Sequence, residues 1–160
     1  MNVSPATVVD EHERLRSNAS IPPLINEIRD RLGPLFGVEV AHVSSEQYRA
    51  EVDAVFEDGD RAVNIAALCG LLRPLDCEGD YPGFVVDEFL GRKLAATIAG
   101  GEPFALLAEA TFHFADVHTH GDPDETAGSD DLDAALAAGF QTRLPGWEWT
   151  KGESPFSSRR

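Results

Sequence analysis

Residues 84–118 read FVVDEFLGRKLAATIAGGEPFALLAEATFHFADVH, and this stretch decides the predicted fold. Its first half places apolar side chains three or four positions apart, which is the spacing of a buried helix face. These side chains are Val85, Phe89, Leu90, Leu94 and Ile98. Gly100 and Gly101 stop this helix, and Pro103 suits the first turn of a second one that runs to near His118. We therefore predict a helical hairpin over residues 84–118.

Further helices are predicted on both sides of this hairpin. Ser44, with Gln47 three positions later, forms a capping-box pattern that starts one of them. Another is apolar nearly all round, as in a buried helix. The predicted helices cover residues 5–16, 22–32, 45–57, 61–72 and 132–140. The predicted fold class is therefore mainly α: a compact helical domain of about six helices with at most a small sheet.

Short segments of alternating pattern leave room for that small sheet. Val38–Val43 alternates and is rich in valine, which predicts a short strand. The alternative fold class is α+β, with further strands at Ala62–Leu68 and Thr111–His118, because periodicity alone does not separate a buried strand from a buried helix. We expect one globular domain over residues 1–150 and a flexible tail over residues 151–160.

The chain is strongly acidic, and its charge is unevenly distributed. It carries 28 Asp and Glu against 13 Lys and Arg, a net charge of −15, and no Lys or Arg occurs from Leu94 to Thr142. Such a field repels nucleic acid and anionic lipid, and it favours a basic partner, a cation or simple solubility. No apolar run is long enough for a membrane span, and Cys69 and Cys77 are too few for a disulfide framework. We therefore expect a cytoplasmic protein that binds neither nucleic acid nor membrane.

Three of the five histidines fall within residues 113–120, HFADVHTH. On a helix, the spacing of His113, Asp116 and His120 places their side chains on one face, whereas on an extended chain His118 and His120 share a side. Histidine with carboxylate suits zinc or iron. The predicted metal ligands are therefore His113, Asp116, His118 and His120. The alternative is a helix end whose histidines face the negative end of the helix dipole.

An acidic stretch and an aromatic end follow this cluster. From Asp122, oxygen-bearing side chains fall at the spacing of an EF-hand calcium loop, but Ala127 stands where that loop needs glycine, so an acidic linker is the better interpretation. Aromatic side chains near the C-terminus either anchor a partner or cover the edge of the core. The predicted partner-binding residues are Asp122, Asp124, Asp130, Asp131, Trp147 and Trp149. Asp87 and Glu88 are expected on a solvated face, because neighbours on a helix point in different directions.

Two functions from different classes are compatible with these residues. The first is that of a small acidic soluble protein that acts through binding, as an interaction, inhibitor or accessory protein with a basic partner. The alternative is a metal-dependent, hydrolase-like enzyme that uses the His113, Asp116, His118 and His120 cluster with zinc or iron as its divalent metal. The sequence leaves the substrate and the oligomeric state open.

Overall fold

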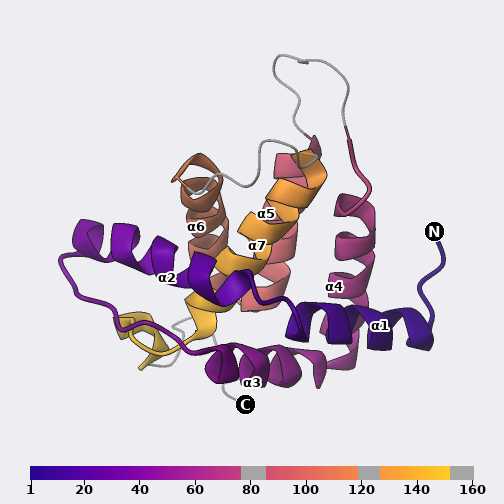
Figure 1. The fold of residues 1–160 in the computed structure, drawn as a ribbon, viewed down its shortest axis with the longest axis horizontal. Helices are drawn as coiled ribbons and strands as arrows, with labels where there is room; N and C mark the ends of the chain where they lie inside the picture. The colour runs from indigo at the N-terminus through magenta and orange to yellow at the C-terminus, as the bar shows by residue number, and fades with distance from the viewer. Residues whose placement is uncertain (77–85, 119–126, 152–160) are drawn as a thin grey trace.

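The computed structural model describes residues 1–76, 86–118 and 127–151, and this part of the chain is almost entirely helical. It contains seven α-helices, two short 3-10 helices and, within these ranges, no strand (Figure 1). Their bounds are α1 Pro5–Arg16, α2 Ile21–Leu32, η1 Gly33–Phe36, α3 Ser45–Phe56, α4 Gly59–Leu72, α5 Val86–Ala99, α6 Phe104–His118, α7 Ala127–Arg143 and η2 Glu148–Thr150. The predicted mainly α class is confirmed, and the α+β alternative is wrong.

The helix starts follow the local chemistry that the sequence indicates. The Ser44 hydroxyl accepts the Gln47 backbone N–H at 3.1 Å, and the Gln47 side chain accepts the Ser44 N–H at 2.9 Å. These two bonds satisfy donors that a helix leaves unpaired at its first turn, and they fix the start of α3. Ser4 and Thr7 form the same reciprocal pair at the start of α1.

Both segments of the α+β alternative are helical. Ala62–Leu68 lies in α4, and Thr111–His118 forms the second half of α6. The remaining predicted strand, Val38–Val43, is neither helical nor paired with another strand in the described part of the chain. In the described part of the chain, an apolar run that is long enough for several helical turns therefore forms a helix and not a strand.

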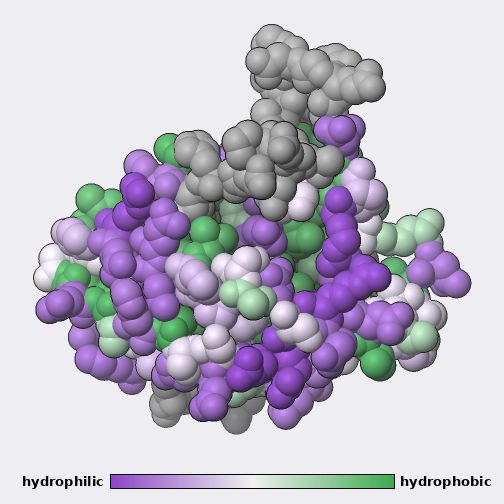
Figure 2. Space-filling model, in the orientation of Figure 1, coloured by the Kyte–Doolittle hydropathy of each residue, from purple (hydrophilic) through white to green (hydrophobic). Residues whose placement is uncertain are grey.

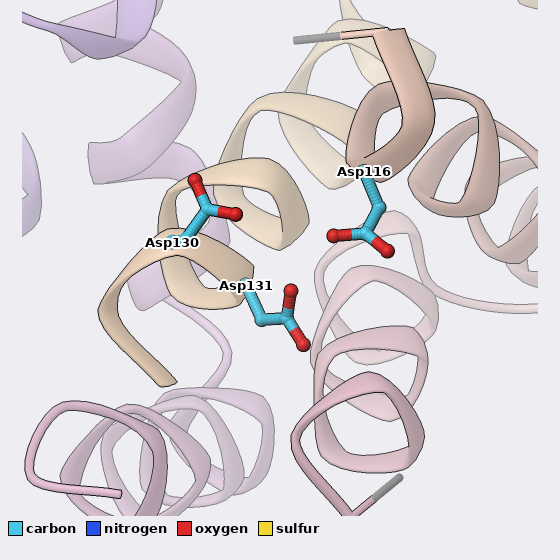
Figure 3. A group of neighbouring side chains, drawn as sticks. All are labelled: Asp116, Asp130 and Asp131. Carbon is cyan, nitrogen blue, oxygen red and sulfur yellow. The ribbon is translucent and has the colours of Figure 1, made fainter. Parts of the chain in front are cut away.

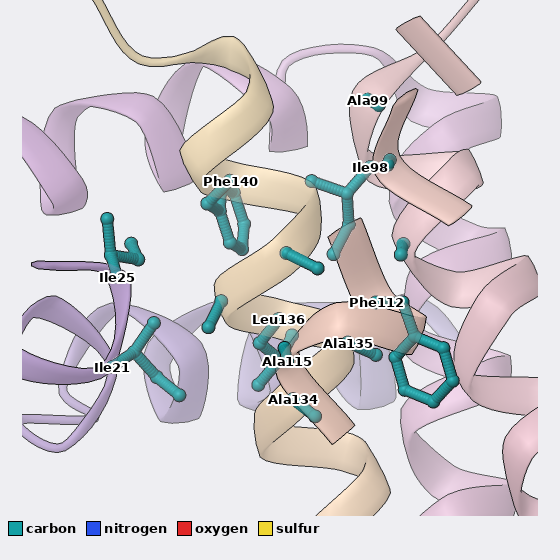
Figure 4. Packing of buried hydrophobic residues seen from close by; sticks show 14 of the residues in the cluster. Ile21, Ile25, Ile98, Ala99, Phe112, Ala115, Ala134, Ala135, Leu136 and Phe140 are labelled. Atoms are coloured by element: carbon teal, nitrogen blue, oxygen red, sulfur yellow. The ribbon is translucent and has the colours of Figure 1, made fainter. Parts of the chain in front are cut away.

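Helix α7 is the centre of the fold, although the sequence predicts only a short helix over residues 132–140. It spans Ala127–Arg143 and packs on α5 and α6, and also on α2, α3 and α4. Every residue from Ala134 to Thr142 is buried, so this part of the helix has no solvent face. Ile98 and Phe112 approach it from the hairpin, and Ile21 and Ile25 from α2 (Figure 4). A helix covered on all sides lacks the polar stripe by which an amphipathic helix is recognised.

Small side chains let the neighbouring helices come close to α7. A Cβ placed on Gly139 would lie 2.8 Å from the Ile98 Cβ and 3.1 Å from the Ala95 carbonyl oxygen of α5. Alanines on the same helix, among them Ala135 and Ala138, are fully buried. The Ala- and Gly-rich composition of this segment thus reflects close packing between helices and not an exposed, weakly ordered helix.

A buried arginine closes the C-terminal end of α7. Arg29 on α2 is 1% exposed, and its guanidinium donates to the carbonyl oxygens of Gln141 at 3.2 Å and Leu144 at 3.1 Å. It also donates to those of Pro145 and Ala41, both at 2.8 Å. Burial lowers the pKa of Arg29 to about 10, so the side chain stays charged at neutral pH. The carbonyls and the negative end of the α7 dipole supply the compensating partial charge.

An ion pair of limited exposure joins α1 to α4. Glu11 on α1 is 4% exposed, and its two carboxylate oxygens accept both terminal nitrogens of Arg73, which caps the C-terminal end of α4. Two parallel hydrogen bonds of this kind fix the relative orientation of the two helices as well as their distance. Glu11 is buried, whereas Arg73 is about a third exposed. The negative charge of the Glu11 carboxylate is therefore balanced mainly by the Arg73 guanidinium.

We expect Arg73→Leu to lower the free energy of unfolding by about 2 kcal/mol, because it leaves the buried Glu11 carboxylate without its counter-charge. Urea denaturation followed by circular dichroism measures this loss. The matched control is Arg92→Leu, which removes an exposed pair with Glu88 one helical turn away and should cost less than about 0.5 kcal/mol. Equal losses in the two variants would contradict the structural role of the Glu11–Arg73 pair.

Candidate functional site

Carboxylates from three helices gather at one end of the molecule. Asp116, Asp130 and Asp131 each place one ligand atom so that the three atoms lie within 4.8 Å of one another. Figure 3 shows Asp116 on α6 facing Asp131 on α7, with Asp130 beside it. Asp87 on α5 is buried and hydrogen-bonds to Asp131. We call Asp87, Asp116, Asp130 and Asp131 the aspartate cluster.

The topology of the last three helices assembles this cluster. Asp87 and Asp130 lie in the first turns of α5 and α7, whereas Asp116 lies in the last turn of α6. The antiparallel arrangement of α5, α6 and α7 brings these three helix ends together. Carboxylates are favoured at the first turns of α5 and α7, because the unpaired N–H groups there carry partial positive charge. This charge offsets part of the mutual repulsion of the aspartates.

Asp131 is the centre of the cluster electrostatically. It is 5% exposed, and burial raises its pKa to about 9, with the nearby Asp116 and Asp87 carboxyls adding to the shift. At neutral pH the native protein therefore holds a proton on Asp131. The O–H group of this protonated acid donates a hydrogen bond to a neighbouring carboxylate. A divalent cation is the other species that would relieve such a group of like charges. An all-oxygen set suits magnesium, calcium or manganese better than the predicted zinc or iron.

The two predicted histidine ligands that the structure describes are not among the converging ligand atoms. His113 is exposed, and its Nδ1 lies 3.6 Å from the Glu88 carboxylate. His118 is also exposed, and its ring packs on Phe114 at 4.4 Å between centroids. His120 lies outside the described residues. Of the four predicted metal ligands, only Asp116 therefore lies among the three carboxylates that converge.

The predicted partner-binding residues that the structure describes differ in how exposed they are. Asp122 and Asp124 lie outside the described residues, Asp130 is half-buried, and Asp131 is buried within the aspartate cluster. Trp147 is 1% exposed, stacks on the half-buried Trp149 at 4.5 Å and donates from its indole nitrogen to Gln141 at 2.9 Å. Trp147 and Asp131 are buried in this structure, and their assignment as contact residues stays a prediction.

Asp87 is the cluster member that sequence reasoning misses. The sequence predicts a solvated face for Asp87 and Glu88, yet Asp87 is 9% exposed. Its only local signal is its position at the start of a helix, which many solvated aspartates share. Helix α5 packs on α6 and α7, and Asp87 lies beside Asp131 of α7, which is far from it in sequence. No spacing within residues 84–118 carries that information.

The basic side chains are largely occupied within the protein. Those in ion pairs with the chain's own carboxylates are Arg16, Arg31, Arg61, Arg73, Arg92, Arg143 and Lys151. Many carboxylates are exposed; among them are Asp10, Glu13, Asp30, Glu39, Glu46, Glu57, Asp60 and Asp76. Hydrophilic side chains cover much of the face shown in Figure 2, with apolar patches between them. The field outside the protein is therefore dominated by negative charge.

Taken together, fold and site define an all-α domain whose central helix carries a carboxylate cluster at its N-terminal end. The chain belongs to the family described as a domain of unknown function, DUF7984, whose model matches residues 1–160. No curated protein and no solved structure matches the chain. None of the helices in the described ranges combines the length and apolar character needed to cross a bilayer.

Proposed function

We propose that the protein acts by binding a basic protein partner. One observation carries this proposal. Most arginines form ion pairs with carboxylates of the same chain, whereas many other carboxylates are exposed to solvent. A partner rich in lysine or arginine would gain electrostatic attraction over the whole approach, which raises the association rate and selects against acidic competitors. The candidate roles are those of an interaction, inhibitor or accessory protein.

We propose that the contact region for this partner lies in the N-terminal half of the chain. Part of the acidic charge of residues 101–150 is enclosed in the aspartate cluster and is not available to a partner. Exposed carboxylates are instead frequent in the N-terminal half, for example at Asp30, Glu39 and Glu46. We therefore place the binding surface on the N-terminal helices and not on the segment that the sequence indicates.

Fluorescence anisotropy with labelled oligolysine and oligoglutamate peptides tests this proposal. We expect binding of oligolysine alone, weakening by more than about tenfold between low and high salt, because screening shortens the reach of surface charge. A lack of oligolysine binding, or an affinity that does not change with salt, would overturn the proposal.

The second candidate function is a metal-dependent, hydrolase-like activity, and Asp116 is the residue that favours it. Among the predicted ligands that the structure describes, it alone lies with two further carboxylates, and one of these, Asp131, is buried. A divalent cation held there would polarise a substrate oxygen or lower the pKa of a water molecule. The ligand set would then be Asp116, Asp130 and Asp131, with His113 outside it.

Thermal melting at pH 8 with added Mn²⁺ tests the cation site without an activity assay. We expect the melting temperature of the wild-type protein to rise, and that of Asp116→Asn to be unaffected by the metal, because binding to the native state alone stabilises it. His113→Ala is the control and should respond like the wild type. If Mn²⁺, Mg²⁺, Ca²⁺ and Zn²⁺ all leave the wild-type melting temperature unchanged, this candidate is excluded.

A further inference from the structure

Two arginines line a hollow to which α1, α2 and α3 all contribute. The hollow has a volume of about 290 Å³ and is lined by the end of α1, the turn into α2 and the first turns of α3. Arg16 comes from α1 and Arg49 from α3, and no Asp or Glu is among the described residues that line it. We call this hollow, with Arg16, Arg49 and Ser45 in its walls, the basic hollow. Its sign is opposite to that of the whole chain, which has a net charge of −15.

The two arginines of the basic hollow keep donors that the protein itself does not use. Among the described residues, Arg49 is the one half-buried basic side chain that no hydrogen bond or ion pair holds. Arg16 binds the two carboxylate oxygens of Asp53 through its Nε, at 3.1 and 3.2 Å, and its terminal nitrogens have no partner in the same part of the chain. The planar fork of a guanidinium matches the two oxygens of a carboxylate. The basic hollow therefore has the donors to bind one carboxylate group.

The basic hollow is one end of a groove that follows α2. A second hollow, of about 570 Å³, shares Pro22 and Ser45 with it, and a third, of about 700 Å³, shares Asp30 and His42 with the second. The three hollows lie along α2 and are bordered by the chain that leads from η1 into α3 (Figure 1). From Pro22 to Pro34 the groove spans roughly 18 Å, because a helix rises about 1.5 Å per residue. That is the length of about five or six residues of an extended peptide.

The second and third hollows carry the opposite charge. Glu27 and Asp30 line the second, Asp30 and Glu39 line the third, and all three carboxylates are exposed. Glu27 and Asp30 each have one exposed basic neighbour, Arg31 at 3.6 Å and His42 at 2.7 Å. Glu39 has no hydrogen bond or ion pair within the ranges that the structure describes. This part of the groove therefore attracts positive charge.

The charge of the groove thus changes sign along its length, and this selects the occupant. Arg29 also lines the third hollow, but its guanidinium is buried and donates to backbone carbonyls. A purely basic segment would be repelled at the basic hollow, and a free anion would be repelled by the acidic protein as a whole. A ligand with one negative group at its end and positive side chains behind it satisfies both parts. The C-terminal segment of a basic protein has this arrangement, because the chain ends in a carboxylate.

We infer that the groove binds the C-terminal segment of the basic partner, with the terminal carboxylate in the basic hollow and basic side chains over Glu27, Asp30 and Glu39. The inference rests on the proposed binding of a basic partner and names the part of the partner that is bound. Arg16 and Arg49 supply the hydrogen-bond donors for the carboxylate. The position of that group fixes the direction in which the segment lies along α2.

Two hexalysine peptides, each labelled with fluorescein at the N-terminus, test this inference by fluorescence anisotropy. One ends in a free carboxylate and the other in a carboxamide. We expect the free acid to bind about tenfold more tightly, because only its carboxylate accepts charge-assisted hydrogen bonds from the basic hollow. General attraction to an acidic protein predicts the reverse order, since the amide is the more positive peptide.

Substitution of Arg49 gives the matching test on the protein side. We expect Arg49→Gln to bind the free acid about tenfold more weakly and the amide no more weakly than the wild type does. A loss of positive charge without a specific site would instead tighten the binding of both peptides. The matched control is Arg14→Gln, an exposed arginine of α1 that lines none of the three hollows and whose removal should keep the preference for the free acid. Thermal melts establish that both variants are folded, and the comparison of the two peptides on the wild-type protein needs no variant.

The outcomes separate this inference from the proposed function. Equal binding of the two peptides, or tighter binding of the amide, would overturn the docking of a chain end but leave the basic partner standing. A preference for the free acid that Arg49→Gln leaves intact would place the carboxylate elsewhere and would overturn the inference as well. Failure of both peptides to bind would instead overturn the proposed function, and the inference with it.

Discussion

Arg29→Met is expected to lower the free energy of unfolding by at least about 3 kcal/mol, a large share of the 5–15 kcal/mol typical of a domain. The guanidinium donates four hydrogen bonds to carbonyls from two separate parts of the chain, at residue 41 and at residues 141–145, and methionine fills a similar volume without donating any. Buried carbonyl groups that lose their donors cost about 1–3 kcal/mol each when water cannot replace them.

The location of Arg29 raises the cost further. It binds the last carbonyls of α7, the helix on which most of the core packs, and its guanidinium lies 5.9 Å from the centre of the Trp147 ring. Arg29→Lys should recover less than half of the loss, because one ammonium group with three donors cannot reach all four carbonyls. The side chain thus acts as a cap for the central helix.

Chemical denaturation with circular dichroism gives both values. The control is Arg31→Met on the same helix, which removes an exposed pair with Glu27 and should change stability by less than about 0.5 kcal/mol. If Arg29→Met unfolds at the same denaturant concentration as Arg31→Met, the capping role assigned to Arg29 is wrong.

Asp131→Asn is expected to stabilise the protein by about 2 kcal/mol at pH 7.5 in the presence of EDTA. Burial and the neighbouring Asp116 and Asp87 raise the pKa of Asp131 to about 9, whereas an unfolded aspartate titrates near 3.9. Folding at pH 7.5 therefore has to bind a proton to a carboxylate that is ionised in the unfolded chain. Asparagine fits the same space, donates a hydrogen bond as the protonated acid does, and needs no proton.

The pH dependence of this gain has a fixed sign. Between about pH 4 and pH 9 the native state binds more protons at this residue than the unfolded state, so its contribution to stability falls as the pH rises. The stability difference between Asp131→Asn and wild type should therefore be near zero below pH 4 and increase up to about pH 9. Measuring the difference cancels the contributions of all groups that the two proteins share.

Urea denaturation at a series of pH values provides the measurement. Asp10→Asn, an exposed aspartate on α1, is the control for the general benefit of removing one negative charge from an acidic protein. Its effect should be small and nearly independent of pH. An Asp131→Asn variant that is less stable than wild type at pH 7.5, or a difference that does not change with pH, would contradict the protonated state of Asp131.

The elements of the fold are largely predictable, because their signals are local. Ser4 with Pro5, and Ser44 with Gln47, carry the chemistry that starts a helix, and Gly100-Gly101 carries the chemistry that stops one. The extent and place of α7 are not predictable in this way. Its alanines and glycines give a weak amphipathic signal because the helix is surrounded, and burial from all sides is a property of the assembled bundle.

The residues of the candidate site are less predictable from the sequence than the helices are. The sequence points to residues 113–120 because histidine and aspartate stand close together there, but the α6 helix turns His118 away from Asp116 and leaves His113 exposed. Asp87, Asp116 and Asp131 come from three helices, so no spacing along the chain relates them. The burial of Trp147 is equally hard to read from the sequence, since an aromatic residue that anchors a partner and one that closes a core look alike there.

The sequence by itself determined the acidic character, the mainly helical class and the approximate bounds of most helices other than α7, because charge, capping and apolar periodicity act over a few residues. Only the tertiary structure decided that α7 is central, that Arg29 caps it, and that the excess charge of residues 101–150 is partly enclosed. Each of these depends on which helix ends and faces meet. That is set by packing between segments far apart in the chain, and no local pattern encodes it.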